Sequence, residues 1–321
     1  MSILVTGGAG FIGSHVVDRL ADEGRPTISM DNFNDYYSPD IKRANVERHR
    51  QSECVEMVEG DICDRSLCER IFRNHDITRV IHLAARAGVR PSIEQPLLYE
   101  RVNCQGTLNL LECARKAEVE MFLFGSSSSV YGVTDRVPFR EDNPCECPIS
   151  PYAATKRSGE LFCHAYHHLY DFPIVALRFF TVYGPRQRPD LAIHKFVRLI
   201  DNGEPITMYG DGTSRRDYTY VTDIVEGVMA ALESDLQFEI INLGNSDPVE
   251  LRRLIELIEE AMGRKAPIER LPDQPGDVPL TYADVSKAET LLAYRPEVPI
   301  ADGIKRFVEW YRHTKRETEG L

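Results

Sequence analysis

The sequence predicts an α/β fold, with a doubly wound parallel sheet that has helices on both faces and a smaller C-terminal α/β domain. Two observations support this prediction. Short apolar runs alternate with helical patterns up to about residue 180, and beyond that point Pro and Gly cluster and the alternation changes. Continuous apolar runs are typical of strands buried on both faces, and parallel strands need crossover helices between them. The alternation therefore favours a parallel sheet covered on both sides.

The elements of the first part follow one another in strand–helix order. Apolar runs predict strands at 3–5, 27–30, 55–58, 79–83, 121–124 and 174–179. Apolar residues at helical spacing predict helices at about 13–23, 39–50, 64–74, 97–117 and 152–170. Each helix is long enough to cross from one parallel strand to the next.

The second part predicts a change of domain and a return to the first. Pro and Gly cluster at 184–189, 203–212 and 272–279, and helical patterns remain at 191–202, 223–234, 249–262 and 300–314. Phe238, Ile240 and Ile241 predict one more strand of the main sheet. We therefore expect a dinucleotide-binding domain from 1–180 plus about 217–245, and a substrate-binding domain from 181–216 plus about 246–321.

The charge balance and the cysteines narrow the class of protein. Lys and Arg number 38 against 50 Asp and Glu, so the formal net charge of −12 argues against nucleic acid or a membrane as a partner. No apolar run approaches the ~20 residues of a membrane span, and the N-terminus lacks the pattern of a signal peptide.

The scattered Cys residues include no C-x-x-C pair, which is typical of reduced cytoplasmic thiols. His164 and His168 lack a third ligand, so we expect no metal.

A glycine-rich segment between the first strand and the first helix predicts a dinucleotide site. Thr6–Gly13 reads T-G-G-A-G-F-I-G, with Gly7, Gly10 and Gly13 flanking Phe11 and Ile12. The first glycine permits a tight turn, the second lets the backbone approach a pyrophosphate, and the third lets helix and strand pack closely. The N-terminus of the helix then offers free N–H groups to the phosphates.

Residues that follow the next strands complete this predicted site. Asp31 ends the second strand, where a carboxylate accepts hydrogen bonds from ribose hydroxyls and repels a 2′-phosphate, which favours NAD over NADP. Capping of the following segment is the alternative role for Asp31. Asp61 and Ile62 follow the third strand and suit the adenine. The small side chains of Leu83–Ala85 follow the fourth strand and leave room for the cofactor beside the backbone.

A tyrosine and a lysine predict the catalytic group. Tyr152 and Lys156 are four residues apart and share one helix face. A neighbouring ammonium and a nicotinium charge both lower the pKa of a phenol, so Tyr152 is the expected general base. Ser126–Ser129 end the fifth strand, at the sheet edge that faces the ligand crevice. A hydroxyl there can share the substrate proton with Tyr152.

Five motifs together resemble the extended short-chain dehydrogenase/reductase family of nucleotide-sugar enzymes. They are T-G-G-A-G-F-I-G (6–13), H-L-A-A (82–85), S-S-S-S-V-Y-G (126–132), S-P-Y-A-A-T-K (150–156) and R-R-D-Y-T-Y-V-T-D (215–223). The resemblance implies a Rossmann-like fold, a bound NAD that Asn32 also contacts, and a catalytic triad of Ser127, Tyr152 and Lys156. It also implies a homodimer that pairs the helices at 97–117 and 152–170, although their apolar residues could instead belong only to the core.

The residues after Ser127 bear on the reaction that the resemblance implies. Members of the family that dehydrate or decarboxylate the 4-keto sugar carry an Asp-Glu pair or a Glu where Ser128 and Ser129 stand here. Neither hydroxyl titrates near neutral pH. The remaining outcome is return of the hydride to the opposite face of C4, which is epimerisation. A dehydratase, a decarboxylase and a non-catalytic NAD-binding protein are the weaker alternatives.

The segment Arg178–Asp190 resembles UDP-glucuronate 4-epimerases, with Thr181 where UDP-galactose 4-epimerases commonly have Asn. The resemblance places Arg188 against the C6 carboxylate of a UDP-hexuronate, a group that a guanidinium binds through two hydrogen bonds. A loop contact or a phosphate contact is the alternative for Arg188. The runner-up function is a UDP-glucose/UDP-galactose 4-epimerase that also accepts N-acetyl sugars. Further substrate contacts that the resemblance implies are Ser128, Arg216 and either Arg86 or Arg90 at the diphosphate, Tyr209 at the uracil and Asp277 at the ribose.

Overall fold

The computed structural model describes residues 1–272 and 278–319, and its centre is a seven-stranded parallel sheet. The strand order is β3-β2-β1-β4-β5-β6-β10, so the direction of winding reverses between β1 and β4. The strands are β1 (Ser2–Thr6), β2 (Thr27–Asp31), β3 (Val55–Glu59), β4 (Ile77–His82), β5 (Met121–Ser127), β6 (Ile174–Phe179) and β10 (Phe238–Leu243). The doubly wound sheet is therefore confirmed, and so is the late strand at Phe238.

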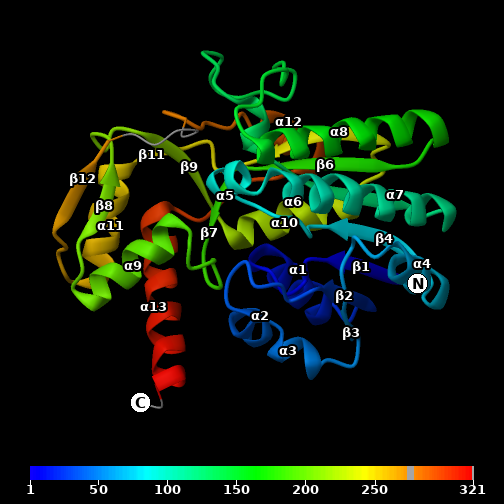
Figure 1. The fold of residues 1–321 in the computed structure, drawn as a ribbon, viewed down its shortest axis with the longest axis horizontal. Coiled ribbons are helices and arrows are strands. Elements are labelled where there is room, and N and C mark those ends of the chain that lie inside the picture. The colour runs from blue at the N-terminus through cyan, green and yellow to red at the C-terminus, as the bar shows by residue number, and fades with distance from the viewer. Residues whose placement is uncertain (273–277, 320–321) are drawn as a thin grey trace.

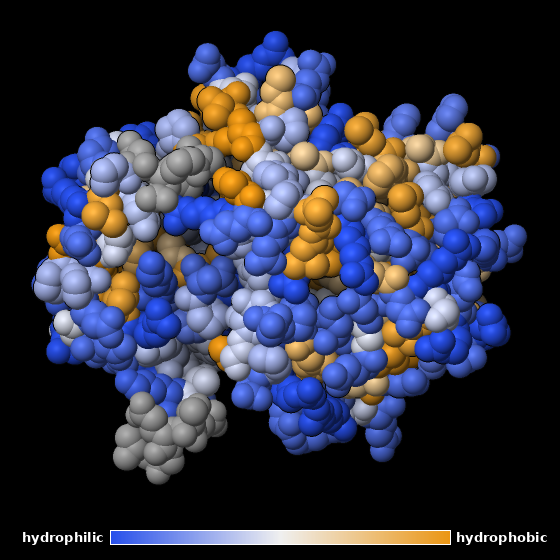
Figure 2. Space-filling model, in the orientation of Figure 1, coloured by the Kyte–Doolittle hydropathy of each residue, from blue (hydrophilic) through white to orange (hydrophobic). Residues whose placement is uncertain are grey.

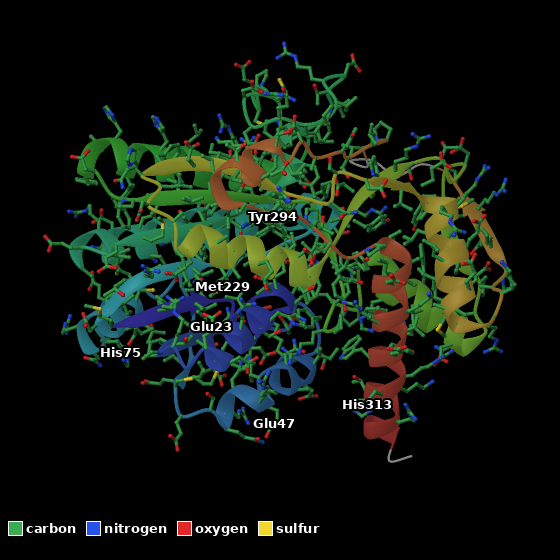
Figure 3. The ribbon with its side chains drawn as sticks, turned by 180° about the vertical axis from the view of Figure 1, so that it is seen from behind. Glu23, Glu47, His75, Met229, Tyr294 and His313 are labelled. Atoms are coloured by element: carbon green, nitrogen blue, oxygen red, sulfur yellow. The ribbon has the colours of Figure 1, made fainter. Side chains whose placement is uncertain are left out.

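Helices cover both faces of this sheet (Figure 1). One face carries α1 (Phe11–Asp22), α10 (Val221–Leu232) and α12 (Ser286–Leu292), and the other carries α4 (Arg65–Asn74), α7 (Gly106–Lys116) and α8 (Pro151–Tyr170). A separate apolar core fills each interface. Seen from behind, α10 with Met229 lies next to α1, which Glu23 directly follows (Figure 3). The apolar residues of the strands and helices are thus buried on both faces of one sheet.

Two of the predicted helices are interrupted. The stretch at 39–50 forms α2 (Pro39–Asn45) and α3 (Glu47–Arg50), because Val46 between them leaves helical geometry and packs against Ala9 and Phe33. The stretch at 97–117 begins with α6 (Pro96–Glu100) and passes through a π-helical turn (Arg101–Gln105) into α7. A short helix, α5 (Val89–Glu94), precedes them. Tertiary packing decided these breaks, which periodicity cannot show.

A smaller α/β unit lies beside the carboxyl ends of the strands, at the left of Figure 1. Its strands are β7 (Thr181–Tyr183), β8 (Ile206–Tyr209), β9 (Arg215–Tyr220), β11 (Pro248–Glu250) and β12 (Ile268–Leu271), in sheets ordered β11-β9-β7 and β12-β8. Its helices are α9 (Ala192–Asn202), α11 (Leu251–Met262) and α13 (Ile300–Glu319), which share one apolar core with these strands. The strands are short and largely polar, and for this reason the hydrophobic pattern does not reveal them.

The surface of the molecule is mixed. Polar side chains dominate the face in Figure 2, and apolar side chains gather over α8. Every helix in residues 1–272 and 278–319 is too short or too polar to span a lipid bilayer. All eight cysteines are free thiols.

Candidate active site

A pocket opens where the strand order reverses, at the carboxyl ends of β1, β2, β4 and β5, which is where ligands bind to such sheets. The predicted residues that line it are Gly7, Gly10, Phe11, Ile12, Gly13, Asp31, Asn32, Asp61, Ile62, Leu83, Ala84, Ala85, Arg86, Tyr152, Lys156 and Arg188. Those that do not line it are Arg90, Ser127, Ser128, Thr181, Tyr209 and Arg216. Asp277 lies outside the described residues. The structure thus brings the predicted dinucleotide site and the Tyr–Lys pair together.

The glycine-rich loop has the geometry that a pyrophosphate requires. Gly7 has φ +74°, a left-handed conformation that favours glycine. A Cβ on Gly13 would lie 2.1 Å from the carbonyl oxygen of Gly7, so only glycine allows α1 to approach the loop this closely. Gly10 begins α1 without a side-chain cap, so the first N–H groups of the helix remain for a ligand. A dinucleotide fits this cradle.

Asp31 is buried at the end of β2 and orients the loop around it. Its carboxylate accepts hydrogen bonds from the N–H of Ala9 at 3.2 Å and of Phe33 at 2.9 Å. Burial raises the pKa of this carboxyl group, and the ammonium of Lys42, 4.0 Å away, opposes the rise. The Asp31 carboxylate can therefore accept hydrogen bonds from ribose hydroxyls. It also connects the glycine-rich loop to the segment that follows β2.

The structure adds pocket residues that the sequence prediction did not assign. Asn34, Tyr36, Tyr37 and Lys42 all line the pocket from the segment after β2. The Tyr37 hydroxyl is buried with no hydrogen-bond partner among the described residues, as expected of a group that faces a ligand. The run D-N-F-N-D-Y-Y (31–37), directly after β2, is a signal that could have found the tyrosines, but nothing distinguishes Lys42 from any other helical lysine.

Tyr152 is placed by the start of α8. The Ser150 side chain caps this helix by accepting the N–H of Ala153 at 3.2 Å, and Pro151 occupies its first turn. Tyr152 therefore lies near the end of β5, with the Ser127 side chain close enough to affect the pKa of its phenol. Burial raises the pKa of the Tyr152 phenol, whereas the Ser127 hydrogen bond and the positive charge of Arg188 lower it.

Lys156, one helical turn after Tyr152, faces the backbone of β5. Its ammonium donates to the carbonyl oxygen of Gly125 at 2.6 Å and lies 5.1 Å from the ring centroid of Phe124. Burial lowers the pKa of Lys156 to about 8. The lysine therefore lies against β5, and the charge of Arg188 lowers the pKa of the Tyr152 phenol.

Arg188 enters the pocket from the loop between β7 and α9. Asp190 accepts from its Nε at 3.0 Å and from its Nη2 at 2.8 Å. The loop itself is anchored to α1, because Arg186 pairs with Asp18 at 2.6 Å and His15 hydrogen-bonds to the carbonyl oxygen of Pro185 at 2.9 Å. Within the described residues the hydrogen bonds of Arg188 all go to Asp190, so its Nη1 edge remains for an anion.

The other predicted substrate residues lie around this pocket. The guanidinium carbon of Arg90 on α5 lies 4.9 Å from the ring centroid of Tyr209, which ends β8. This contact joins the main unit to the smaller one. Thr181 begins β7, two residues beyond the end of β6, and Ser128 begins the 3₁₀ turn after β5. Arg216 lies on β9, where its guanidinium donates to the carbonyl oxygen of Arg215. Their contacts with a substrate remain predictions.

Comparison with known families agrees with this geometry. The fold and pocket define a dinucleotide-binding protein of the extended short-chain dehydrogenase/reductase class. The chain belongs to the family whose model is described as GDP-mannose 4,6 dehydratase, which matches residues 4–307. A UDP-glucuronate 4-epimerase from Thermodesulfobacterium geofontis is 44% identical over 308 residues, covering 96% of this chain and 95% of that protein.

Two solved structures are similar over nearly their whole length. One is the UDP-glucuronic acid 4-epimerase of Bacillus cereus, in complex with UDP-glucuronic acid and NAD, with 37% identity, a TM-score of 0.93 and coverage of 98% of this chain and 100% of that chain. The other is the UDP-glucose 4-epimerase of Thermotoga maritima, with UDP-glucose, with 36% identity, a TM-score of 0.91 and the same coverage. The fold is therefore shared by enzymes named for charged and for neutral sugars.

Proposed function

We propose that this chain is an NAD-dependent UDP-sugar 4-epimerase that interconverts UDP-glucuronate and UDP-galacturonate through a 4-keto intermediate. The observation that carries the substrate assignment is Arg188, which lines the pocket, acts on Tyr152 and keeps one guanidinium edge for an anion. A guanidinium edge matches a planar carboxylate. The similarity to enzymes named for UDP-glucuronate supports the same assignment.

The residues divide the chemistry between them. Tyr152 takes the proton of the C4 hydroxyl and later returns it, and Ser127 shares that proton through its hydrogen bond to the phenol. Lys156 holds positive charge below them. Bound NAD supplies the acceptor and the donor of the C4 hydride. Since the same cofactor is restored in each turnover, the enzyme needs no external reductant.

The turn after β5 favours epimerisation over elimination, although the family is described by a dehydratase. Ser128 and Ser129 begin this turn, and neither hydroxyl is an acid or base near neutral pH. Asp31 and Asp61 are the carboxylates among the described residues that line the pocket. Both follow strands on the far side of the sheet from β5, so neither is placed to act on C5 of a sugar beside Tyr152.

The test is a comparison of substrates. The purified protein is incubated with UDP-glucuronate and with UDP-glucose, and the C4 stereoisomers are separated by chromatography. We expect faster turnover of the uronate, and Arg188→Ala should remove most of this advantage, because it should lower turnover of UDP-glucuronate much more than turnover of UDP-glucose. Arg65→Ala is the control, because Arg65 pairs with Glu69 on the surface of α4. Faster turnover of UDP-glucose by the unmodified protein would reject the uronate assignment.

The second candidate is a UDP-glucose 4-epimerase, because the structure of such an enzyme is almost as similar. For that function Arg188→Ala should lower turnover of UDP-glucose and of UDP-glucuronate by the same factor. Release of water or CO₂, detected by mass spectrometry of the sugar product, would instead indicate a dehydratase or a decarboxylase.

Three further expectations belong to this proposal. NAD is assigned to the unit of residues 1–180 and about 217–245, and the UDP-sugar to 181–216 and about 246–321, where Thr181, Tyr209, Arg216 and Asp277 are expected to contact it. The eight free thiols support a cytoplasmic protein. Exposed Leu161 and Leu169 on α8 support a homodimer through α7 and α8. Replacing both leucines by Glu should give a monomer in sedimentation analysis.

A further inference from the structure

The Tyr36 ring contacts two of the arginines that line the pocket. The guanidinium carbon of Arg188 lies 5.1 Å from the ring centroid, and that of Arg86 lies 5.5 Å from it. Both arginines and Tyr36 line the same pocket. The face of an aromatic ring attracts a guanidinium, and the attraction strengthens when water is excluded. The ring therefore holds two positive charges in the pocket, and one of them, Arg188, acts on the Tyr152 phenol.

Tyr36 is itself held at both ends. Its hydroxyl donates to the carbonyl oxygen of Ala87 at 2.6 Å, an oxygen that also accepts from the Tyr99 hydroxyl at 2.8 Å. Its backbone N–H donates to the Asn34 side chain at 3.1 Å. The ring is thus a fixed surface between the segment after β2 and the segment after β4.

Arg188 depends on two supports. Asp190 fixes one edge of the guanidinium through two hydrogen bonds, but the Asp190 side chain is itself 46% exposed. The Tyr36 ring supports the flat face. A carboxylate and an aromatic face together define the plane of a guanidinium. With the partly exposed carboxylate alone, the guanidinium would rotate whenever the Asp190 side chain rotated. The direction of the free Nη1 edge therefore follows from the ring.

We propose that Tyr36 is a specificity-determining positioning residue, whose ring holds Arg188 so that its free edge faces the C6 group of the sugar and selects a carboxylate there. This inference rests on the proposed function, in which Arg188 binds that carboxylate. The proposed mechanism gives Tyr36 no proton or hydride to transfer, so its expected effect is on discrimination between uronate and neutral sugar.

The effect of Tyr36 is separable from the cofactor site. The Asn32 side chain accepts the N–H of Asn34 at 3.2 Å, and the Asn34 side chain accepts the N–H of Tyr36. These turns hold the backbone of the segment without the Tyr36 ring. Loss of the ring should therefore leave the bound NAD in place.

The test measures binding of both sugars to NAD-loaded protein. All variants carry Tyr152→Phe, which prevents turnover, and calorimetry gives the Kd of UDP-glucuronate and of UDP-glucose. Tyr36→Leu removes the ring, and Tyr36→Phe keeps the ring but loses the hydrogen bond to Ala87. We expect Tyr36→Leu to raise the Kd of UDP-glucuronate about tenfold, which corresponds to the loss of a desolvated cation–π contact. UDP-glucose should change less than about twofold, and Tyr36→Phe should retain the preference.

A double-mutant cycle completes the test. When Arg188 is already Ala, Tyr36→Leu should have no further effect on UDP-glucuronate. Equal losses for both sugars, or an undiminished loss in the Arg188→Ala background, would overturn the role of Tyr36. If Arg188→Ala itself spares the uronate, the proposed function fails and this inference fails with it. Tyr36→Gln replaces Tyr36→Leu if the latter loses NAD or a normal melting transition.

Discussion

Glu160→Gln should destabilise the fold strongly, because Glu160 balances a fully buried arginine. Glu160 on α8 and Arg178 on β6 are each 1% exposed. The Glu160 carboxylate accepts from Nε of Arg178 at 2.8 Å, from Nη2 at 2.9 Å, from the Ser126 hydroxyl at 2.6 Å and from Arg157 at 2.9 Å. The change to Gln removes the negative charge and places an N–H₂ group against these donors.

The magnitude follows from the charge that is left behind. Removing one partner of a buried ion pair costs about 3–5 kcal/mol, since the other charge remains buried without compensation. Arg178 has no path to solvent, and its Nη1 has no hydrogen-bond partner among the described residues even in the native protein. An exposed ion pair contributes only about 0–1 kcal/mol. Glu160→Gln should therefore cost several times more than a change at the surface.

Urea unfolding of the NAD-loaded protein measures this difference. Glu256→Gln is the matched control, because Glu256 pairs with Arg253 on the exposed side of α11. We expect a large decrease in the midpoint for Glu160→Gln and almost none for Glu256→Gln. Equal midpoints for the two variants would refute the reasoning that the buried pair is needed as a pair.

The pH dependence of unfolding gives the sign of the same interaction. Burial by itself raises the pKa of Glu160, but the hydrogen bonds and charge of Arg178 outweigh it and hold the pKa below its usual value. A depressed carboxyl pKa contributes stability above the unfolded pKa of about 4.3, and this stability is lost as the pH falls through the folded pKa. The unmodified protein should therefore lose more stability than Glu160→Gln on acidification below about pH 4. A constant difference across that range would contradict this assignment.

Three further predictions concern the pocket. Tyr152→Phe should lower kcat by about 10²–10⁴-fold because proton transfer is lost, with unchanged NAD content, and near-normal turnover would contradict the role of the phenol. Asp31→Ala should reduce the amount of NAD that stays bound during gel filtration, because it removes the carboxylate that accepts from the ribose and from the Ala9 N–H. The bound NAD is measured by absorbance after denaturation, and full retention would exclude this role of Asp31. Gly13→Ala should lower both NAD content and the melting temperature, because its Cβ meets the Gly7 carbonyl oxygen, whereas an unchanged melting temperature would show that the loop can yield.

Local patterns account for what could be predicted without the structure. The strand–glycine loop–helix unit around Gly7 and Gly13 depends on neighbours in the chain, and so does the helix that places Tyr152 and Lys156 on one face. Apolar runs revealed each strand of the main sheet, because parallel strands are buried on both sides. The strands of the smaller unit were missed, since β9 begins with two arginines and a partly solvated strand of few residues has no clear pattern.

The class of sheet, the dinucleotide loop and the Tyr–Lys pair could be predicted from the sequence, because spacing along the chain sets each of them. Only the tertiary structure decided that Lys156 turns toward the backbone of Gly125 and that Arg188 acts on Tyr152 and stacks on Tyr36. These contacts join segments far apart in the chain, and their energies depend on burial and on the direction of each side chain. Burial and side-chain direction are both set only when the sheet has formed and brought the strand ends together.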